Sequence, residues 1–296
     1  MEISSMNKKA IILAGGKGSR LYPMTSVYSK QLQHVYDKPM IYYPLSTLML
    51  GGIKDILIIS TPEDTPNYER LLGDGSQWGI NIQYIVQASP DGLPQAFILG
   101  EEFIDNSEVC LILGDNLFYG KLDFFRNGLL HNQGATIFAY RVDNPESYGV
   151  VEFDSNMSVI SIEEKPNSPK SNYAIPGLYI FNHHVVEYAK SLKPSKRGEL
   201  EIIDLHNQYR KLNSLNVEII GRGVAWLDTG TPDSLLEAAN FIHAIEKRQG
   251  TKIACLEEIA LIQNFISFDT FNNNISQLPN CEYKNYCIKI SKEYSR

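Results

Sequence analysis

The chain has 296 residues, of which 43% are hydrophobic and 21% are charged, a composition typical of soluble globular proteins. Its formal net charge of -7 provides no overall positive field for nucleic acid or an anionic membrane, so an anionic ligand must meet local positive charge. The first ten residues, MEISSMNKKA, lack the apolar core of a secretory signal, and no apolar run is long enough to span a bilayer. We therefore expect a cytoplasmic protein with no membrane segment.

Over the first 140 residues, short apolar runs alternate with helical patterns. Near-continuous apolar runs predict buried parallel strands at 10–14, 55–60, 82–87 and 108–114. Apolar residues at helical spacing predict helices at 38–52, 93–104 and 122–132, the first beginning at Pro39. Because alternating strands and helices form right-handed βαβ units, we predict a doubly wound, mostly parallel (Rossmann-like) α/β sheet with ligands at the carboxyl ends of its strands.

From residue 135 onward the pattern changes to closely spaced strands separated by turn residues. We predict an antiparallel β extension from the runs at 135–142, 148–154, 158–166 and 173–181. Helical patterns follow at 185–192 and 199–212, then a strand at 216–221 and a long helix at 232–249. We expect one α/β domain over residues 1–250, which includes the β extension, and a C-terminal helical appendage over 251–296.

The cysteines and histidines give no sign of metal or redox chemistry. The four cysteines, Cys110, Cys255, Cys281 and Cys287, form no C-x-x-C pair, and the six histidines show no ligand spacing. Cys110 lies in an apolar run and is expected to be a small core residue. We therefore predict neither a zinc site nor a thiol redox centre.

A glycine-rich loop, LAGGKGSRL, follows the first predicted strand. Gly15, Gly16 and Gly18 allow backbone N–H groups to approach an anion with no Cβ in the way. The loop is neither a Walker A motif nor a dinucleotide fingerprint, since Leu21 stands where the third glycine of the latter belongs. A plain tight turn is the alternative, but Arg20 and Lys30 supply cations suited to phosphate oxygens.

Three polar positions end apolar runs elsewhere in the chain. Asp115 follows the strand at 108–114, and Asp228 follows GVAWL; each can offer a carboxylate oxygen to Mg²⁺. The alternative for Asp115 is a turn-forming residue, and the alternative for Asp228 is a turn in which Thr229 or Thr231 caps the next helix. Lys165 ends a strand, where a lysine is usually a solvated edge charge, so it is a weak signal by itself. Together with the glycine loop, these groups indicate a Mg²⁺-dependent enzyme of phosphoryl or nucleotidyl transfer.

The chain resembles the sugar-1-phosphate nucleotidylyltransferases, and within them the thymidylyltransferases that use glucose 1-phosphate, from about Lys9 to Ile290. The resemblance rests on ordered blocks that include GGKGSRLYPMT, SKQL, LLGDGSQWG, DGLPQAF, LGDNLFYG, ESYGVVEFD, EEKPNSPKSNYAIPGLYIF, RGELEIIDL and GRGVAWLDTGTPDSLLEA. It implies a reversible reaction in which dTTP and glucose 1-phosphate give dTDP-glucose and pyrophosphate. The sugar phosphate oxygen would attack the α-phosphorus of dTTP in line.

The resemblance also implies roles for individual residues. It assigns catalysis to Arg20, Lys30 and Lys165, and Mg²⁺ binding to Asp115 and Asp228. The nucleotide would contact Leu13, Gly15, Gly16, Gly18, Ser19, Gln31, Gln87 and Gly92. The sugar would contact Tyr148, Gly149, Glu164 and Ile175.

Some positions depart from the family pattern without removing a charged participant. Ser19 replaces a usual threonine, Ile175 replaces a frequent valine, and Ala88 and Pro94 differ beside the base-recognition loop. Sequence therefore leaves open the same chemistry with UTP or another sugar 1-phosphate, and a non-catalytic sugar-nucleotide-binding regulatory subunit. The resemblance further implies a homotetramer and feedback by a dTDP-sugar.

Overall fold

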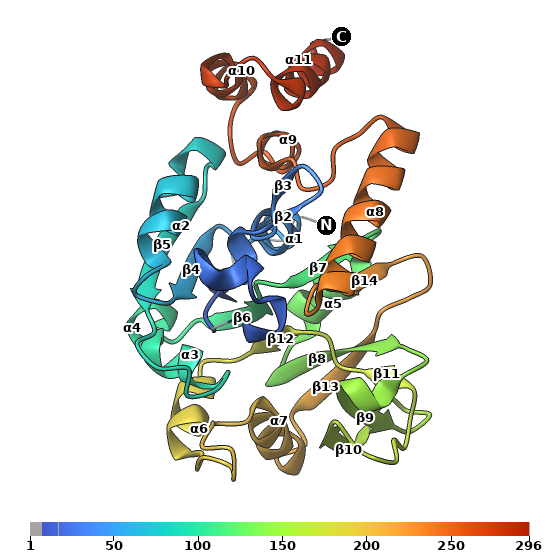
Figure 1. The fold of residues 1–296 in the computed structure, drawn as a ribbon. Coiled ribbons are helices and arrows are strands. Elements are labelled where there is room, and N and C mark those ends of the chain that lie inside the picture. The colour runs from blue at the N-terminus through green and yellow to red at the C-terminus, as the bar shows by residue number, and fades with distance from the viewer. Residues whose placement is uncertain (1–7, 17, 296) are drawn as a thin grey trace.

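The computed structural model describes residues 8–16 and 18–295, and a ten-stranded sheet runs through its centre (Figure 1). The strand order is β10-β9-β11-β8-β12-β6-β1-β4-β5, with β13 paired to β8. The strands are β1 (Lys8–Leu13), β4 (Asp55–Ser60), β5 (Asn81–Val86), β6 (Glu108–Leu113), β8 (Ala135–Arg141), β9 (Gly149–Phe153), β10 (Val159–Glu164), β11 (Tyr173–Ala174), β12 (Leu178–Phe181) and β13 (Leu215–Ile219).

Four strands, β5, β4, β1 and β6, are mutually parallel, which confirms the predicted doubly wound sheet. The chain runs from β1 outward to β4 and β5, then returns to place β6 on the other side of β1. The order of strands therefore reverses between β1 and β6, where open α/β sheets bind ligands. The carboxyl ends of these two strands lie side by side, since Leu13 pairs with Leu113 and the Gly114 N–H donates to the Leu13 carbonyl at 3.0 Å.

The predicted antiparallel extension is also confirmed. Strand β12 runs antiparallel to both β6 and β8, and β9, β10 and β11 continue the sheet with antiparallel pairings. Two small ribbons lie outside the main sheet: β7 (Asn116–Tyr119) with β14 (Ala225–Asp228), and β2 (His34–Val35) with β3 (Lys38–Pro39). The sequence analysis did not predict β2, β3 or β7.

The first predicted helix begins later than expected. Pro39 belongs to β3, and the helix starts at Tyr42, because the segment before it is extended. There the Met40 N–H donates to the Gln33 carbonyl at 2.8 Å and the Ile41 N–H to the Gln31 carbonyl at 2.9 Å. These bonds fix the chain that carries Lys30 and Gln31.

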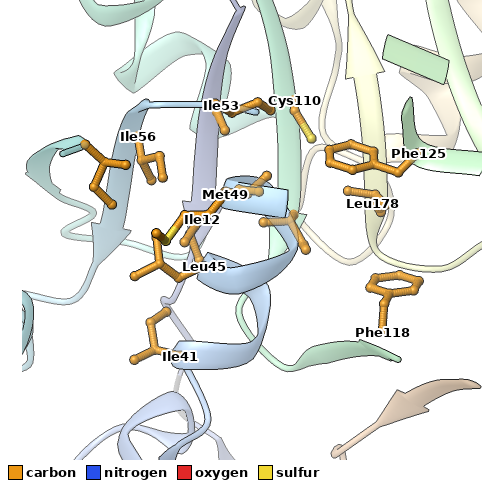
Figure 2. Packing of buried hydrophobic residues seen from close by; sticks show 14 of the residues in the cluster. Ile12, Ile41, Leu45, Met49, Ile53, Ile56, Cys110, Phe118, Phe125 and Leu178 are labelled. Carbon is orange, nitrogen blue, oxygen red and sulfur yellow. The ribbon is translucent and has the colours of Figure 1, made fainter. Parts of the chain in front are cut away.

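Helices cover both faces of the sheet (Figure 1). They are α1 (Tyr42–Leu50), α2 (Thr65–Leu72), α3 (Gln95–Leu99), α4 (Glu101–Ile104), α5 (Asp123–His131), α6 (Val185–Ser191), α7 (Ile202–Lys211), α8 (Pro232–Gln249), α9 (Leu256–Ile262), α10 (Phe268–Gln277) and α11 (Glu282–Tyr294). Alternate residues of each strand face opposite layers. Ile12 therefore packs with Leu45, Met49 and Phe125 of one core (Figure 2), whereas Ile11 packs in the other.

The C-terminal helices attach through α9. Leu256, Ile259 and Ala260 of α9 belong to the same core cluster as β1, while α10 and α11 form a further cluster with the opposite side of α9. The helical nature of the tail agrees with the sequence analysis, and the division after residue 250 stays a prediction. Among residues 8–16 and 18–295, no helix combines the length and the apolar character that a membrane crossing needs.

Candidate active site

The glycine loop leaves the carboxyl end of β1 and turns into a short 3-10 helix, Ser19–Leu21. Gly16 and Gly18 have φ of +96° and +56°, conformations that favour glycine. A Cβ on Gly15 would lie 2.7 Å from the Gln87 Oε1 atom, and one on Gly18 would lie 2.9 Å from Thr25. The tight path of the loop therefore depends on its glycines.

This loop forms one wall of a cavity of about 220 Å³, here named the loop cavity. It is lined by Gly15, Gly16, Gly18, Ser19, Arg20, Leu21, Lys30, Gln31, Asp115 and Gly230. Eight of these ten residues were predicted site residues, and the remaining two are Leu21 and Gly230. A backbone-rich wall with an arginine and a lysine suits a phosphorylated ligand.

The two predicted metal carboxylates are brought together by the β7–β14 ribbon. Asp115 directly precedes β7, and Asp228 ends β14 opposite Asn116 in the antiparallel register. The Thr229 hydroxyl donates to the Asp115 backbone carbonyl at 2.9 Å, which ties the two strand ends together. Sequence positions more than a hundred residues apart therefore meet at one point of the site.

The electrostatics of this carboxylate pair suit a cation. Burial and the charge of Asp115 raise the pKa of Asp228, while Lys30 and Arg20 oppose the shift. The Lys30 ammonium, on a side chain only 8% exposed, donates to Asp115 Oδ2. Two neighbouring carboxylates, one of which has a raised pKa, can bind a divalent cation such as Mg²⁺ through their hard oxygen atoms.

A second cavity of about 270 Å³, here named the β-extension cavity, opens beside the loop cavity. Its lining includes Tyr148, Gly149, Glu164, Lys165 and Ile175, all predicted sugar-side or catalytic positions, together with Asp228. Arg20 and Asp115 line both cavities. The two cavities therefore meet at a cation and a carboxylate, where a reaction between two bound phosphorylated ligands could occur.

Lys165 has a strained backbone and an exposed side chain. Its φ of +44° is unusual for a non-glycine residue, and its N–H donates to the Tyr148 carbonyl at 3.0 Å. The side chain is 56% exposed and its ammonium lies 3.9 Å from Glu164. Backbone strain of this kind at a cavity rim is common at functional sites.

The other predicted nucleotide-side residues lie close to the loop cavity or apart from it. Gln87 is buried, its Oε1 faces Gly15, and its Nε2 donates to Gln95 at 2.5 Å. Gln31 lines the loop cavity and its buried Oε1 has no hydrogen-bond partner among the described residues. Leu13 and Gly92 line neither cavity; Gly92 pairs instead with Leu200, which lines the β-extension cavity.

Several residues of the site were missed by the sequence analysis. They include Asn116, Tyr179, Arg197, Glu201, His206 and Trp226, all of which line the β-extension cavity. Asn116 and Trp226 stand in motif blocks already noted, close to the predicted Asp115 and Asp228, whereas Arg197 and Glu201 stand in the block RGELEIIDL, which held no predicted site residue. Tyr179 also stands in a block already noted, EEKPNSPKSNYAIPGLYIF, but its apolar run predicts only a strand. His206 lies just outside the block RGELEIIDL, and its pattern predicts only a helix.

A separate group of possible metal ligands lies among the C-terminal helices. The Cys255 and Cys287 thiols are 3.8 Å apart, and Cys255 Sγ lies 3.9 Å from Glu257. All three residues are buried and line neither cavity. Sequence spacing could not show this group, since 32 residues separate the two cysteines.

Comparison with known proteins agrees with the fold. Residues 9–245 match the family model described as "Nucleotidyl transferase". A glucose-1-phosphate thymidylyltransferase of Neisseria meningitidis is 55% identical over 96% of this chain and 100% of its own length, and one of Xanthomonas campestris is 53% identical over 96% and 97%. A Bacillus anthracis protein solved in complex with sucrose is 41% identical, with a TM-score of 0.74 over 79% of this chain and 94% of that one.

A doubly wound sheet with a glycine loop, paired carboxylates, the buried Lys30 and the exposed Arg20 at its switch point defines an enzyme that acts on phosphorylated ligands. The chain belongs to the nucleotidyl transferase family.

Proposed function

We propose that this chain transfers a thymidylyl group from dTTP to α-D-glucose 1-phosphate, releasing pyrophosphate and forming dTDP-glucose. The observation that carries the proposal is the pair of cavities that share Arg20 and Asp115. The loop cavity suits a triphosphate, and the β-extension cavity suits a sugar phosphate. The shared residues mark where the α-phosphorus would meet the attacking oxygen.

Each residue then has a role in positioning or charge stabilisation, which phosphoryl transfer needs more than proton transfer. Backbone N–H groups of the glycine loop and the Ser19 hydroxyl hold the triphosphate. Arg20 stabilises the leaving pyrophosphate, Lys30 neutralises phosphate charge, and Lys165 orients the attacking sugar phosphate. Lys165 is well suited to this, since its exposed side chain can turn toward a bound anion.

Two separate sets of residues are proposed to recognise the thymidine and the sugar. The thymidine is proposed to contact Leu13, Gln31, Gln87 and Gly92. The buried Oε1 atom of Gln31, which has no partner among the described residues, could accept a hydrogen bond from the ligand. Tyr148, Gly149, Glu164 and Ile175 are proposed to contact the sugar. Asp115 and Asp228 would hold Mg²⁺, which when bound neutralises phosphate charge and polarises the phosphoryl group.

The first test is pyrophosphate release with glucose 1-phosphate and Mg²⁺, comparing dTTP, UTP, CTP, ATP and GTP. We expect dTTP to dominate, and the Asp115→Asn, Asp228→Asn double variant to lose at least about 100-fold in rate. The matched control replaces two exposed carboxylates away from the site, Asp105→Asn with Asp143→Asn, and should keep full activity.

Other outcomes would identify other functions. A preference for UTP would retain the mechanism and change the substrate, as one methyl group gives limited discrimination. If no nucleotide supported turnover, binding of dTDP-glucose measured by calorimetry would favour a non-catalytic regulatory subunit. Unchanged activity in the double variant would contradict the metal assignment.

Assembly and location are part of the same proposal. The family resemblance supports a homotetramer that is inhibited by a dTDP-sugar and works in the cytoplasm. Light scattering of the purified protein would give the oligomeric mass, and inhibition kinetics with dTDP-sugars would test the feedback.

A further inference from the structure

His206 is a buried residue in the wall of the β-extension cavity that the proposed reaction does not yet use. It lies on α7 one turn from Ile202 and Ile203, and all three line the cavity. His206 does not line the loop cavity, so it is placed on the proposed sugar side and away from the triphosphate.

The ring of His206 is held by aromatic neighbours. It stacks on Phe181 with a centroid distance of 5.8 Å and an interplanar angle of 11°, and it lies 5.0 Å from the ring of Tyr179. Tyr179 also lines the cavity. The imidazole therefore forms part of the layer directly behind the cavity surface.

The polar atoms of this ring are unsatisfied. His206 is 1% exposed, and neither Nδ1 nor Nε2 has a hydrogen-bond partner among the described residues. Burial lowers the pKa of His206 to about 3, so the ring is neutral at physiological pH and offers one donor and one acceptor. A phenylalanine would fill the same aromatic stack without leaving two polar atoms unpaired, so packing alone does not account for a histidine here.

The surroundings indicate what the ring would bind. Ile175, Ile203 and Leu113 are apolar residues of the cavity lining, and Glu164 supplies a carboxylate to it. A hydroxyl group, which both donates and accepts, matches a neutral imidazole. A phosphate would be better bound by the cations of the lining, Arg20, Lys165 and Arg197.

We propose that His206 is a specificity-determining residue that hydrogen-bonds one hydroxyl of the bound sugar, directly after the ring turns about its Cβ–Cγ bond or through one ordered water. This inference rests on the proposed function, because it assigns the β-extension cavity to the sugar 1-phosphate. It adds a polar contact from α7 to the cavity wall.

The test pairs a variant with substrates that lack single hydroxyls. His206→Phe keeps the stack and removes both polar atoms, and its kcat/KM is measured with glucose 1-phosphate and with its 2-, 3-, 4- and 6-deoxy analogues. We expect a loss of roughly 10- to 100-fold with glucose 1-phosphate and with three of the analogues. With the one analogue that lacks the contacted hydroxyl, wild type and variant should be equal. The KM for dTTP should not change.

Controls separate recognition from folding. His206→Gln retains a donor and an acceptor and should recover part of the activity, and His184→Phe, at an exposed histidine outside both cavities, should match wild type. Equal losses with every analogue, or no loss with any, would overturn the proposal. If wild type released no pyrophosphate with any sugar 1-phosphate, the proposed function would fail first. Calorimetric binding of dTDP-glucose and its deoxy analogues to the same variants would then test His206.

Discussion

Asn116 connects the carboxylate site to the strands around it. Its Nδ2 donates to Asp115 Oδ1 at 2.8 Å, and its Oδ1 accepts from the Gly177 N–H at 3.0 Å and the Trp226 Nε1 at 2.7 Å. The side chain is 5% exposed. One amide therefore fixes the direction of a proposed metal ligand and of two segments that line the β-extension cavity.

Replacing Asn116 by Asp tests this positioning role. The carboxylate keeps an acceptor for Trp226 and Gly177, but it loses the donor to Asp115 and places two acceptors face to face. We expect kcat to fall by about 10- to 100-fold and the Mg²⁺ concentration needed for half-maximal rate to change, because like charges repel at this distance.

The control for this variant is its thermal unfolding. A small change in Tm with a large loss in kcat supports positioning. A Tm loss that accounts for the missing activity would assign Asn116 to folding alone.

At the scale of single residues, the sequence predicted groups whose chemistry is visible in a motif. Arg20, Lys30, Asp115 and Asp228 follow recognisable loops or strand ends, and the structure brings them together at the two cavities. His206 could not be found this way, since its helix shows only amphipathic spacing. Its significance comes from burial without partners, which is a tertiary property.

Among the elements, the β7–β14 ribbon decides how the site is assembled. The strand predicted at 108–114 is β6, which ends at Leu113, and β7 follows it after two residues. Strand β7 pairs with β14, far along the chain. The side chains of Asn116 and Trp226, which join the two strands by a hydrogen bond, are 110 residues apart in the sequence. A four-residue strand that follows the previous strand after only two residues is too short to be recognised from periodicity. The meeting of Asp115 and Asp228 was therefore predicted through resemblance, and its structural cause is this ribbon.

Gly92 joins two loops at the edge of the β-extension cavity. It bridges to Leu200, with a φ of +108°, and a Cβ there would lie 2.1 Å from the Leu200 carbonyl oxygen. Its neighbour Leu93 and Leu200 itself both line the cavity. Gly92, which is proposed to contact the nucleotide, is therefore also packed closely against the backbone of Leu200.

We expect Gly92→Ala to destabilise the protein by more than about 2 kcal/mol, since it combines a strained φ with a backbone clash. Gly198→Ala is the matched control, because Gly198 has a φ of +81° and nothing within 4 Å of its Cβ position. That control should cost only about 1 kcal/mol. Urea unfolding of both variants measures the difference, and equal costs would show that the contact with Leu200 yields without strain.

In the whole molecule, the parallel strands are buried apolar runs, and for this reason the sequence predicted these strands and the class of sheet well. The β2–β3 hairpin was missed because its two-residue strands carry no period, and its place depends on partners far along the chain. Lys38 of this hairpin pairs with Glu246 of α8 at 3.0 Å, across 208 residues. Lys252, after α8, pairs with Asp37 and Glu246.

This four-residue network joins the hairpin that follows Lys30 to the start of the C-terminal helices. Lys38 and Glu246 are buried, and Glu246 also accepts from the Ile253 N–H at 2.8 Å. Burial alone would raise the pKa of Asp37, but the hydrogen bonds and charges of Lys252 and Lys38 outweigh it and lower that pKa. The ionised form of Asp37 therefore stabilises the folded state.

A lowered folded-state pKa gives a definite sign to the pH dependence. Above the unfolded-state pKa of about 3.9 the contribution of Asp37 is complete, and it disappears as the pH falls through the folded-state value. Asp37→Asn should cost about 1 kcal/mol at neutral pH, a modest figure because the carboxylate is partly exposed. The difference from wild type should shrink as the pH is lowered below about 4. Urea unfolding of wild type and variant at neutral pH and below pH about 4 measures this difference in stability, and Asp105→Asn is the control at an exposed carboxylate. If the difference were the same at the two pH values, the ion pairs of Asp37 with Lys38 and Lys252 would not hold the hairpin to α8.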